Sequence, residues 1–146
     1  SNMNIKKELG QRGVQVHTGI TMGNWLKEFI IPSFFRKSET HGELAEFFAK
    51  EFLQRDIGGD SLESIGDIIM ANQEKKDGII HLSPFCCIPE IISQNLIPNI
   101  RNKTEIPIVS FMFDEHMAKT GFITRLEAFI DLAKHNKQRK KCIMAL

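Results

Sequence analysis

The chain contains no tyrosine, a single tryptophan and only three cysteines among its 146 residues. It also lacks any apolar run near the roughly 18–20 residues that a membrane-spanning helix needs, and no signal-peptide pattern opens it. Charge of one sign is not in excess, because 19 Lys and Arg residues are offset by 18 Asp and Glu residues. This balance excludes the basic surface of an autonomous nucleic-acid-binding protein. We therefore expect neither a membrane nor a nucleic acid as a partner.

The cysteines are Cys86, Cys87 and Cys142. Their odd number argues against a disulfide framework, and the neighbours Cys86 and Cys87 could pair only in a strained ring. Free thiols are typical of a reducing compartment. We therefore expect a cytoplasmic protein.

Length and composition favour one globular domain. The chain is 42% apolar and 25% charged, which is typical of a folded domain with its own core. Ser1 and Asn2, which precede Met3, are interpreted as the remnant of an expression tag. We expect a single α/β domain over residues 3–136 and a basic tail over residues 137–146.

The first half of the chain predicts three helices and a short strand. Residues 4–11 indicate a helix, and the apolar residues 14–16 indicate a short strand. Residues 42–54 and 60–72 have the three- and four-residue apolar spacing of amphipathic helices, and Asp60 opens the second with a capping-box pattern. We expect the buried faces of these two helices to contain Leu44, Phe47, Phe48 and Phe52, and Leu62, Ile65 and Ile69, respectively.

The second half predicts two buried strands and two helices. Residues 79–82 and 106–113 are near-continuous apolar runs, typical of strands covered on both faces. A helix between them begins near Pro89, and we expect Pro98 to end it. A last helix follows residue 120. The expected buried faces of these helices contain Ile88, Ile91, Ile92 and Leu96, and Phe122, Leu126, Phe129, Ile130 and Ala133, respectively.

This alternation predicts an α/β fold, a three-layer parallel sheet with flanking helices of the flavodoxin or Rossmann type. The three predicted strands are few for a parallel sheet. We therefore expect a partial domain that belongs to a larger protein.

In an open parallel sheet, ligands bind beyond the carboxyl ends of the strands. Two loops leave that edge, residues 83–90 and residues 114–121, and we predict that they are neighbours in space. In the first loop Cys87 precedes a helix, where unpaired amides and the helix dipole favour a thiolate that binds metals. The alternative is that Cys86 and Cys87 are small buried apolar residues. We do not expect a complete structural zinc site, because the chain has no C-x-x-C pattern and no histidine at zinc spacing.

The second loop contains Asp114, Glu115 and His116, which could supply an acid, a base or a metal ligand. The alternative is a solvated loop that caps the next helix. Gly58 and Gly59 match neither a dinucleotide-binding nor a phosphate-loop pattern.

Four segments in this order resemble one family: GGDSLESIG (58–66), DGIIHLSPFCCIPEI (77–91), IPIVSFMFDEH (106–116) and GFITRLEAFID (121–131). They are similar to the 2-hydroxyacyl-CoA dehydratase and activase-related family, and most to the C-terminal part of CoA-substrate-specific enzyme activases. The resemblance covers about the last two-thirds of the chain.

The resemblance implies an iron–sulfur protein. In that family, dehydratase subunits hold a four-iron four-sulfur cluster, and an ATP-hydrolysing activator supplies one electron for radical dehydration of a 2-hydroxyacyl-CoA. The family's Pro-Phe-x-Cys-x-Pro-Glu cysteine falls on Cys87, which is implied to be a cluster ligand, with Cys86 as the second choice. Other candidate residues of the cleft lie on the two loops at the carboxyl edge of the sheet: Pro84, Phe85, Glu90, Asp114, Glu115 and His116.

The chain lacks the other thiolates of such a cluster and the ATP-binding half of an activase. We therefore expect the chain alone to hold no intact cluster and to catalyse no reaction. The remaining lobes of a parent protein, or a partner subunit, would complete the site. The alternative is a non-catalytic flavodoxin-like scaffold or protein-docking lobe with structural cysteines.

Overall fold

The computed structural model describes residues 4–19, 41–55, 57–114 and 118–144, with side chains up to Arg139 in the last range. The chain divides into two units, residues 1–40 and residues 41–146. In the first unit, α1 (Ile5–Gln11) has a buried face of Ile5 and Leu9. Residues 14–16 are not in a strand, so the short strand expected there is wrong; a strand exists through its ladder of hydrogen bonds, and apolar residues alone do not create one.

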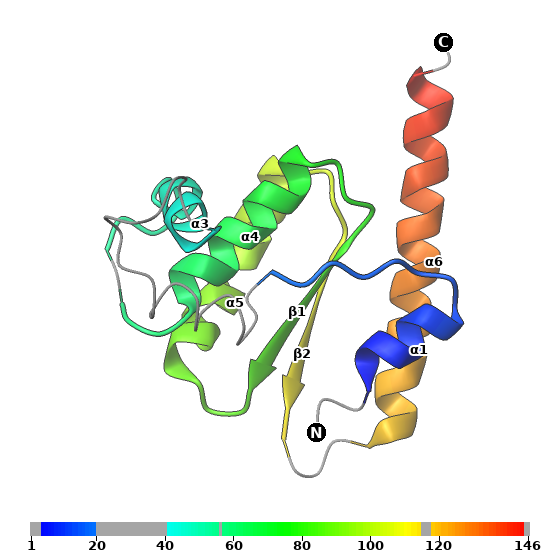
Figure 1. Cartoon of the computed structure of the whole chain (residues 1–146), viewed down its shortest axis with the longest axis horizontal. Helices are drawn as coiled ribbons and strands as arrows, with labels where there is room; N and C mark the ends of the chain where they lie inside the picture. The colour runs from blue at the N-terminus through cyan, green and yellow to red at the C-terminus, as the bar shows by residue number, and fades with distance from the viewer. Residues whose placement is uncertain (1–3, 20–40, 56, 115–117, 145–146) are drawn as a thin grey trace, which may run out of the picture. The chain divides into compact units, whose positions relative to one another are not determined.

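The second unit contains a parallel pair of strands, β1 (Ile79–Pro84) and β2 (Ile108–Phe113) (Figure 1). The register pairs Ile79 with Ile108 at one end and Pro84 with Phe113 at the other. Three helices of this unit flank the sheet: α4 (Ser61–Gln73), α5 (Ile88–Lys103) and α6 (Lys119–Met144). A further helix, α3 (His41–Ala49), packs on α4. The described part of the chain is therefore α/β, with two strands instead of the three expected.

The two faces of the sheet are covered by different helices (Figure 1). Side chains alternate along each strand, so successive residues of β1 and β2 point to opposite faces. On one face, α4 and α5 close a core of Leu62, Ile65, Ile68, Ile97, Ile100, Ile106 and Ile108. On the other face, the rings of Phe111 and Phe113 contact the ring of Phe122 in α6, with centroids 4.8 and 5.8 Å apart.

The prediction for the last helix is confirmed. Ala133 on its inner face is half-buried, and the other four expected side chains are buried: Phe122, Leu126, Phe129 and Ile130. With 26 residues α6 is the longest helix described. No helix in the described ranges is both long and apolar enough to cross a bilayer.

The expected face of α5 is wrong for Ile88 and Ile91, whereas Ile92 is half-buried and Leu96 packs against the core. The expected end of the helix at Pro98 is also wrong. Ile88 and Ile91 are exposed, whereas Glu90, Ser93, Ile97 and Ile100 are buried. The helix also continues through Pro98 to Lys103. A proline inside a helix costs about 3 kcal/mol, and the burial of Ile97 and Ile100 on both sides of Pro98 offsets that cost.

Small residues, not aromatic ones, bring α3 and α4 together. Ala45 and Ala49 are completely buried on α3, whereas Phe47 is 69% exposed, so its expected place in the core is wrong. Gly66 lies opposite Ala45, and a Cβ at Gly66 would be only 2.0 Å from the carbonyl oxygen of Ala45. The helices approach closely because no side chain separates them. The capping box expected at Asp60 is also not formed, since its side chain makes no cap hydrogen bond in the described structure.

Two arginines bond to carbonyl oxygens of β2. Arg101 of α5 donates from Nη2 to the oxygen of Ile108 at 2.6 Å, and Arg125 of α6 donates to the oxygen of Ser110 at 3.1 Å. The carbonyl oxygens of Pro107 and Phe113 accept hydrogen bonds from the side of β1. Successive carbonyl groups of a strand point in opposite directions, so those of Ile108 and Ser110 point to the outer edge of β2. Side chains that cover an edge strand prevent it from pairing with other chains.

We expect Arg101→Met to destabilise the chain by about 1.5–3 kcal/mol, because it removes a charged donor from the carbonyl oxygen of Ile108. Urea unfolding followed by circular dichroism measures the change. Arg55→Met, on an exposed arginine, is the control and should stay within about 0.5 kcal/mol. Equal stability of the two variants would show that the bond to β2 adds nothing.

Candidate functional site

The turn between β1 and α5 carries both cysteines of the expected site. The N–H of Phe85 donates to the carbonyl oxygen of Phe113 at 2.9 Å and extends the pairing of β1 with β2. The N–H of Cys87 then reaches the carbonyl oxygen of Pro84 at 3.4 Å, and the N–H of Ile91 bonds to the oxygen of Cys87 at 2.9 Å. Cys87 is therefore the N-cap of α5, directly after a tight turn.

Cys86 lies inside this turn with φ of 59°, in the left-handed region. This is the third of four residues in the turn, a position where a positive φ favours glycine. A cysteine adopts that conformation only at a cost in strain. The Cys86 side chain is exposed.

The two loops of the expected site leave the same edge of the sheet. The bond from Phe85 to Phe113 places the start of one loop beside the end of the other strand, so the prediction that they are neighbours is confirmed for these residues. Asp114 follows Phe113 and is exposed. Glu115 and His116 lie outside the described residues.

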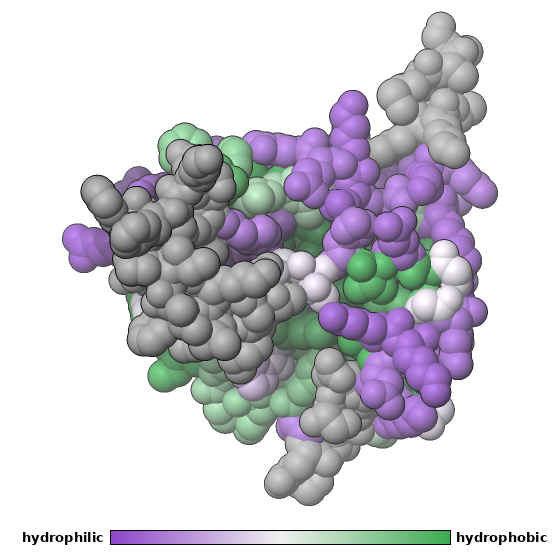
Figure 2. Space-filling view, viewed as in Figure 1, coloured by the Kyte–Doolittle hydropathy of each residue, from purple (hydrophilic) through white to green (hydrophobic). Residues whose placement is uncertain are grey.

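Exposed apolar side chains surround Cys87 along the chain. Cys87 is half-buried, whereas Phe85 is 61% exposed, Ile88 71% and Ile91 40%. We call these three side chains the apolar rim. Figure 2 shows apolar side chains over the turn that joins β1 to α5. Cys87 is therefore not fully enclosed in the core, and its apolar neighbours in the sequence are exposed.

The described residues could supply only part of the ligand set of a cluster. No group of three or more His, Cys, Asp or Glu side chains in the described ranges could hold a metal ion. Cys87 and Cys86 are the thiols at this edge, and the side chain of Cys142 lies outside the described part. A four-iron four-sulfur cluster takes four thiolates, so these residues fit one ligand position and a neighbouring second choice.

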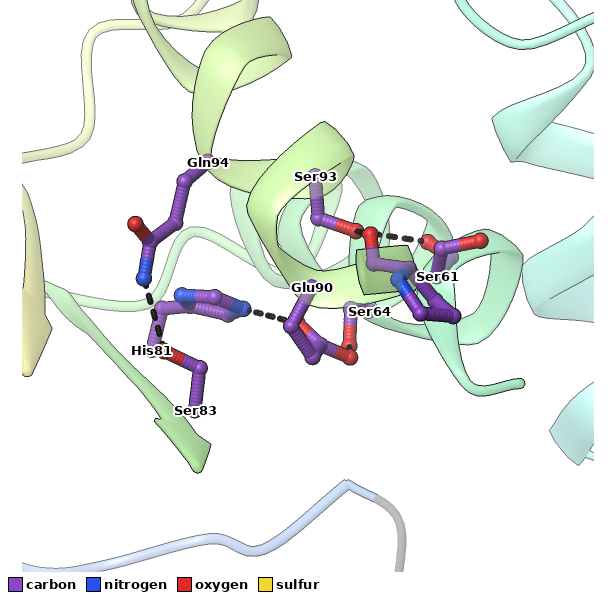
Figure 3. A network of polar contacts seen from close by, with 8 residues as sticks. Ser61, Ser64, His81, Ser83, Glu90, Ser93 and Gln94 are labelled. Atoms are coloured by element: carbon purple, nitrogen blue, oxygen red, sulfur yellow. Dashed lines mark hydrogen bonds and ion pairs between the residues drawn. The ribbon is translucent and has the colours of Figure 1, made fainter. Parts of the chain in front are cut away.

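A buried polar network lies beside this turn, between α4, β1 and α5 (Figure 3). Its centre is Glu90, whose Oε2 lies 2.5 Å from Nε2 of His81. The hydroxyl of Ser64 donates to Oε1 of Glu90 at 2.9 Å. We call Ser64, His81 and Glu90 the Glu90 network. The His81 and Glu90 side chains are only 6% and 8% exposed, so water contributes little to satisfying them.

Other polar groups of the same interface pair around this centre. Gln94 donates to Oγ of Ser83 at 2.7 Å. The hydroxyl of Ser93 is 3.2 Å from the carbonyl oxygen of Pro89 and 3.4 Å from that of Ser61. Together these bonds attach the second turn of α5 to β1 and to the start of α4.

The order of groups in the Glu90 network does not make a nucleophile. In a catalytic triad the hydroxyl bonds to the imidazole and the carboxylate orients that imidazole, whereas here the carboxylate separates Ser64 from His81. Nδ1 of His81 and Oγ of Ser61 are buried without a partner in the described part of the chain. The arrangement is suited to holding elements together.

The sequence pointed to Glu90 but not to its partners. His81 and Ser83 alternate along β1 and face the helices, and Ser64 lies 26 residues before Glu90. The one available signal was the presence of two polar residues, two positions apart, in an otherwise apolar strand. With its carboxylate bonded on both oxygens, Glu90 faces the interior and not the open edge.

A groove of about 310 Å³ lies at the other end of the sheet, before β2 begins. Its lining includes Arg101, Ile106, His135 and Arg139. None of the residues expected to form the site lines it. Comparison of the chain with protein-family models, with curated proteins and with solved structures finds no match.

Proposed function

We propose that this chain is one lobe of an iron–sulfur protein similar to 2-hydroxyacyl-CoA dehydratases and their activases, and that Cys87 supplies one thiolate ligand of a four-iron four-sulfur cluster. One observation carries the proposal. Cys87 is half-buried at the start of α5, at the carboxyl edge of a parallel sheet, and the apolar rim beside it is exposed.

The position of Cys87 fits a ligand shared between lobes. A thiol at a helix N-terminus, partly open to solvent, is placed to coordinate iron. The cluster's other ligands and its water-excluding cover would come from the remaining lobes of a parent protein or from a partner subunit. The apolar rim is the surface that such a lobe would cover, because apolar side chains gathered at an edge indicate an interface.

We propose that the remaining part of the parent protein also completes the sheet. Two parallel strands rarely make a sheet alone, so we propose that they belong to a larger three-layer, flavodoxin- or Rossmann-like sheet. When bound, the cluster would supply one-electron transfer for ATP-driven radical dehydration of a 2-hydroxyacyl-CoA. Alone, the lobe would be inactive.

The proposal is tested on the full-length parent protein with Cys87→Ser and its matched neighbour Cys86→Ser. We expect Cys87→Ser to lower iron and acid-labile sulfide per chain to below about half, since serine replaces a thiolate that iron prefers. Cys86→Ser should keep the wild-type content. Unchanged iron and sulfide in Cys87→Ser would remove the assignment.

A second function is favoured by the exposure of Phe85 and Ile88. As a non-catalytic docking lobe, the chain would use the apolar rim to bind a partner, and both cysteines would be structural. The double variant Phe85→Ser/Ile88→Ser would then abolish assembly, measured by analytical ultracentrifugation of the parent protein. Under this function Cys87→Ser would change neither assembly nor iron content.

A further inference from the structure

The turn that carries Cys87 is held by the backbone bonds of Phe85 and Cys87, but its side chains are mostly exposed. Phe85 and Ile88 on either side of the cysteines are exposed, and Cys86 has a left-handed φ. The side chain of Cys87 makes no cap hydrogen bond to α5 in the described structure. Besides these backbone bonds, the position of the thiol depends on the helix that follows it, since the N–H of Ile91 bonds to the carbonyl oxygen of Cys87.

The first turn of α5 is held from two directions. Glu90, three residues after Cys87, bonds to His81 of β1 through one carboxylate oxygen and to Ser64 of α4 through the other. Beside it, Pro89 contacts the loop before α4 so closely that a Cβ at Gly59 would lie 2.9 Å from its Cγ. In Figure 3 the Glu90 side chain points from α5 toward both partners.

Both bonds of Glu90 end on residues within regular secondary structure. His81 lies in the middle of β1 and Ser64 in the first turns of α4, and both elements contribute to the core. A carboxylate bonded to two such elements restricts translation and rotation of the turn that bears it. A buried carboxylate that is bonded through both oxygens favours one arrangement of the groups that it joins.

We propose that Glu90, held by His81 and Ser64, is a positioning residue for Cys87: it fixes the start of α5 so that the thiol stays at the sheet edge in one orientation. The functional meaning of this positioning rests on the proposed function, in which Cys87 is a cluster ligand. The inference itself concerns a thiol and three side chains of this chain, so it can be tested on the chain without a cluster.

The test compares the reaction of two thiols in one molecule. In a Cys142→Ser background, iodoacetamide alkylation of Cys86 and Cys87 is followed by mass spectrometry at one pH, and the ratio of the two rates is recorded. Cys86 is exposed and Cys87 is half-buried, so local opening of the start of α5 would increase access to Cys87 more than to Cys86. We expect Glu90→Gln to raise the Cys87-to-Cys86 ratio by about tenfold, because local opening exposes the thiol.

Two further variants separate positioning from general stability. Ser64→Ala should raise the ratio by about threefold, and Ser64→Thr, which keeps the hydroxyl, should restore it. Gln94→Ala is the matched control, since Gln94 lies on α5 but bonds to Ser83 instead of Glu90. It should leave the ratio at the wild-type value, even where it lowers Tm.

The amide of Ile91, which donates to the carbonyl oxygen of Cys87 in the first turn of α5, gives an independent measurement. Hydrogen exchange there should accelerate about tenfold in Glu90→Gln relative to amides of α6, as expected for local opening of one helical turn. A wild-type ratio of thiol rates in Glu90→Gln would overturn the proposal. If Glu90→Gln does not fold, a wild-type ratio in Ser64→Ala overturns it equally.

The outcomes also distinguish this inference from the proposed function. A changed thiol ratio, together with unchanged iron in Cys87→Ser of the parent protein, would leave positioning intact and remove the cluster assignment. An unchanged thiol ratio in Glu90→Gln, together with loss of iron in Cys87→Ser, would remove the positioning role of Glu90 and keep the cluster assignment.

Discussion

Gly66→Ala is expected to separate α3 from α4 and to destabilise the second unit by about 4 kcal/mol or more. The new Cβ would lie 2.0 Å from the oxygen, 2.4 Å from the carbon and 2.5 Å from the Cα of Ala45. All three are backbone atoms, so no rotamer change can relieve the overlap. Because domains are stable by only about 5–15 kcal/mol, urea unfolding should show a large fall in midpoint.

Gly121→Ala is the matched control. Gly121 lies in the first turn of α6, and a Cβ there would meet no atom within 4 Å. Alanine in a helix is favoured over glycine by about 0.5–1 kcal/mol, so this variant should be slightly more stable than the wild type. A Gly66→Ala variant with the wild-type midpoint would show that α3 does not pack on α4 through Gly66.

The sequence was sufficient for the elements of the second half. Two apolar runs and two helical patterns predicted β1, α5, β2 and α6 in order, and the buried face of α6 is as expected. These segments are long enough for periodicity to be clear. The common edge of the two loops also followed, because parallel strands joined by a helix end at the same edge.

The faces of α3 and α5 could not be predicted from hydrophobicity. On α5 the polar side chains Glu90 and Ser93 are buried while Ile88 is exposed, since the facing strand presents His81 to that helix. On α3 the close approach of Gly66 selects alanines and leaves Phe47 outside. In both helices the partner surface decides which face is buried, and that surface is distant in sequence.

The candidate site was predicted in part for the same reason. Cys87 and Glu90 belong to one short motif at a helix start, which is a local pattern. Ser64 and His81 reach Glu90 across 26 and 9 residues. Nothing local to either residue shows that contact. The polar positions in β1 indicate only that something polar must face them.

His81→Leu is expected to destabilise the chain by about 3–5 kcal/mol, the cost of removing one partner from a buried charged group. Oε2 of Glu90 would lose its 2.5 Å contact in a region where both side chains are more than nine-tenths buried. Glu90→Leu should cost a similar amount, because it leaves His81 and the hydroxyl of Ser64 without their acceptor. Urea unfolding of both variants measures these losses.

The double variant His81→Leu/Glu90→Leu should cost less than the sum of the single variants, by about 2–3 kcal/mol. Two apolar side chains then replace both members of the pair, and such exchanges are often nearly neutral. The exposed pair Lys137 and Asp77, with Nζ and Oδ2 2.6 Å apart, is the control cycle. Solvent screens it, so its coupling should stay below about 1 kcal/mol. Additive losses for His81 and Glu90 would contradict the prediction, since they would mean that the pair does not act as a unit in holding the start of α5.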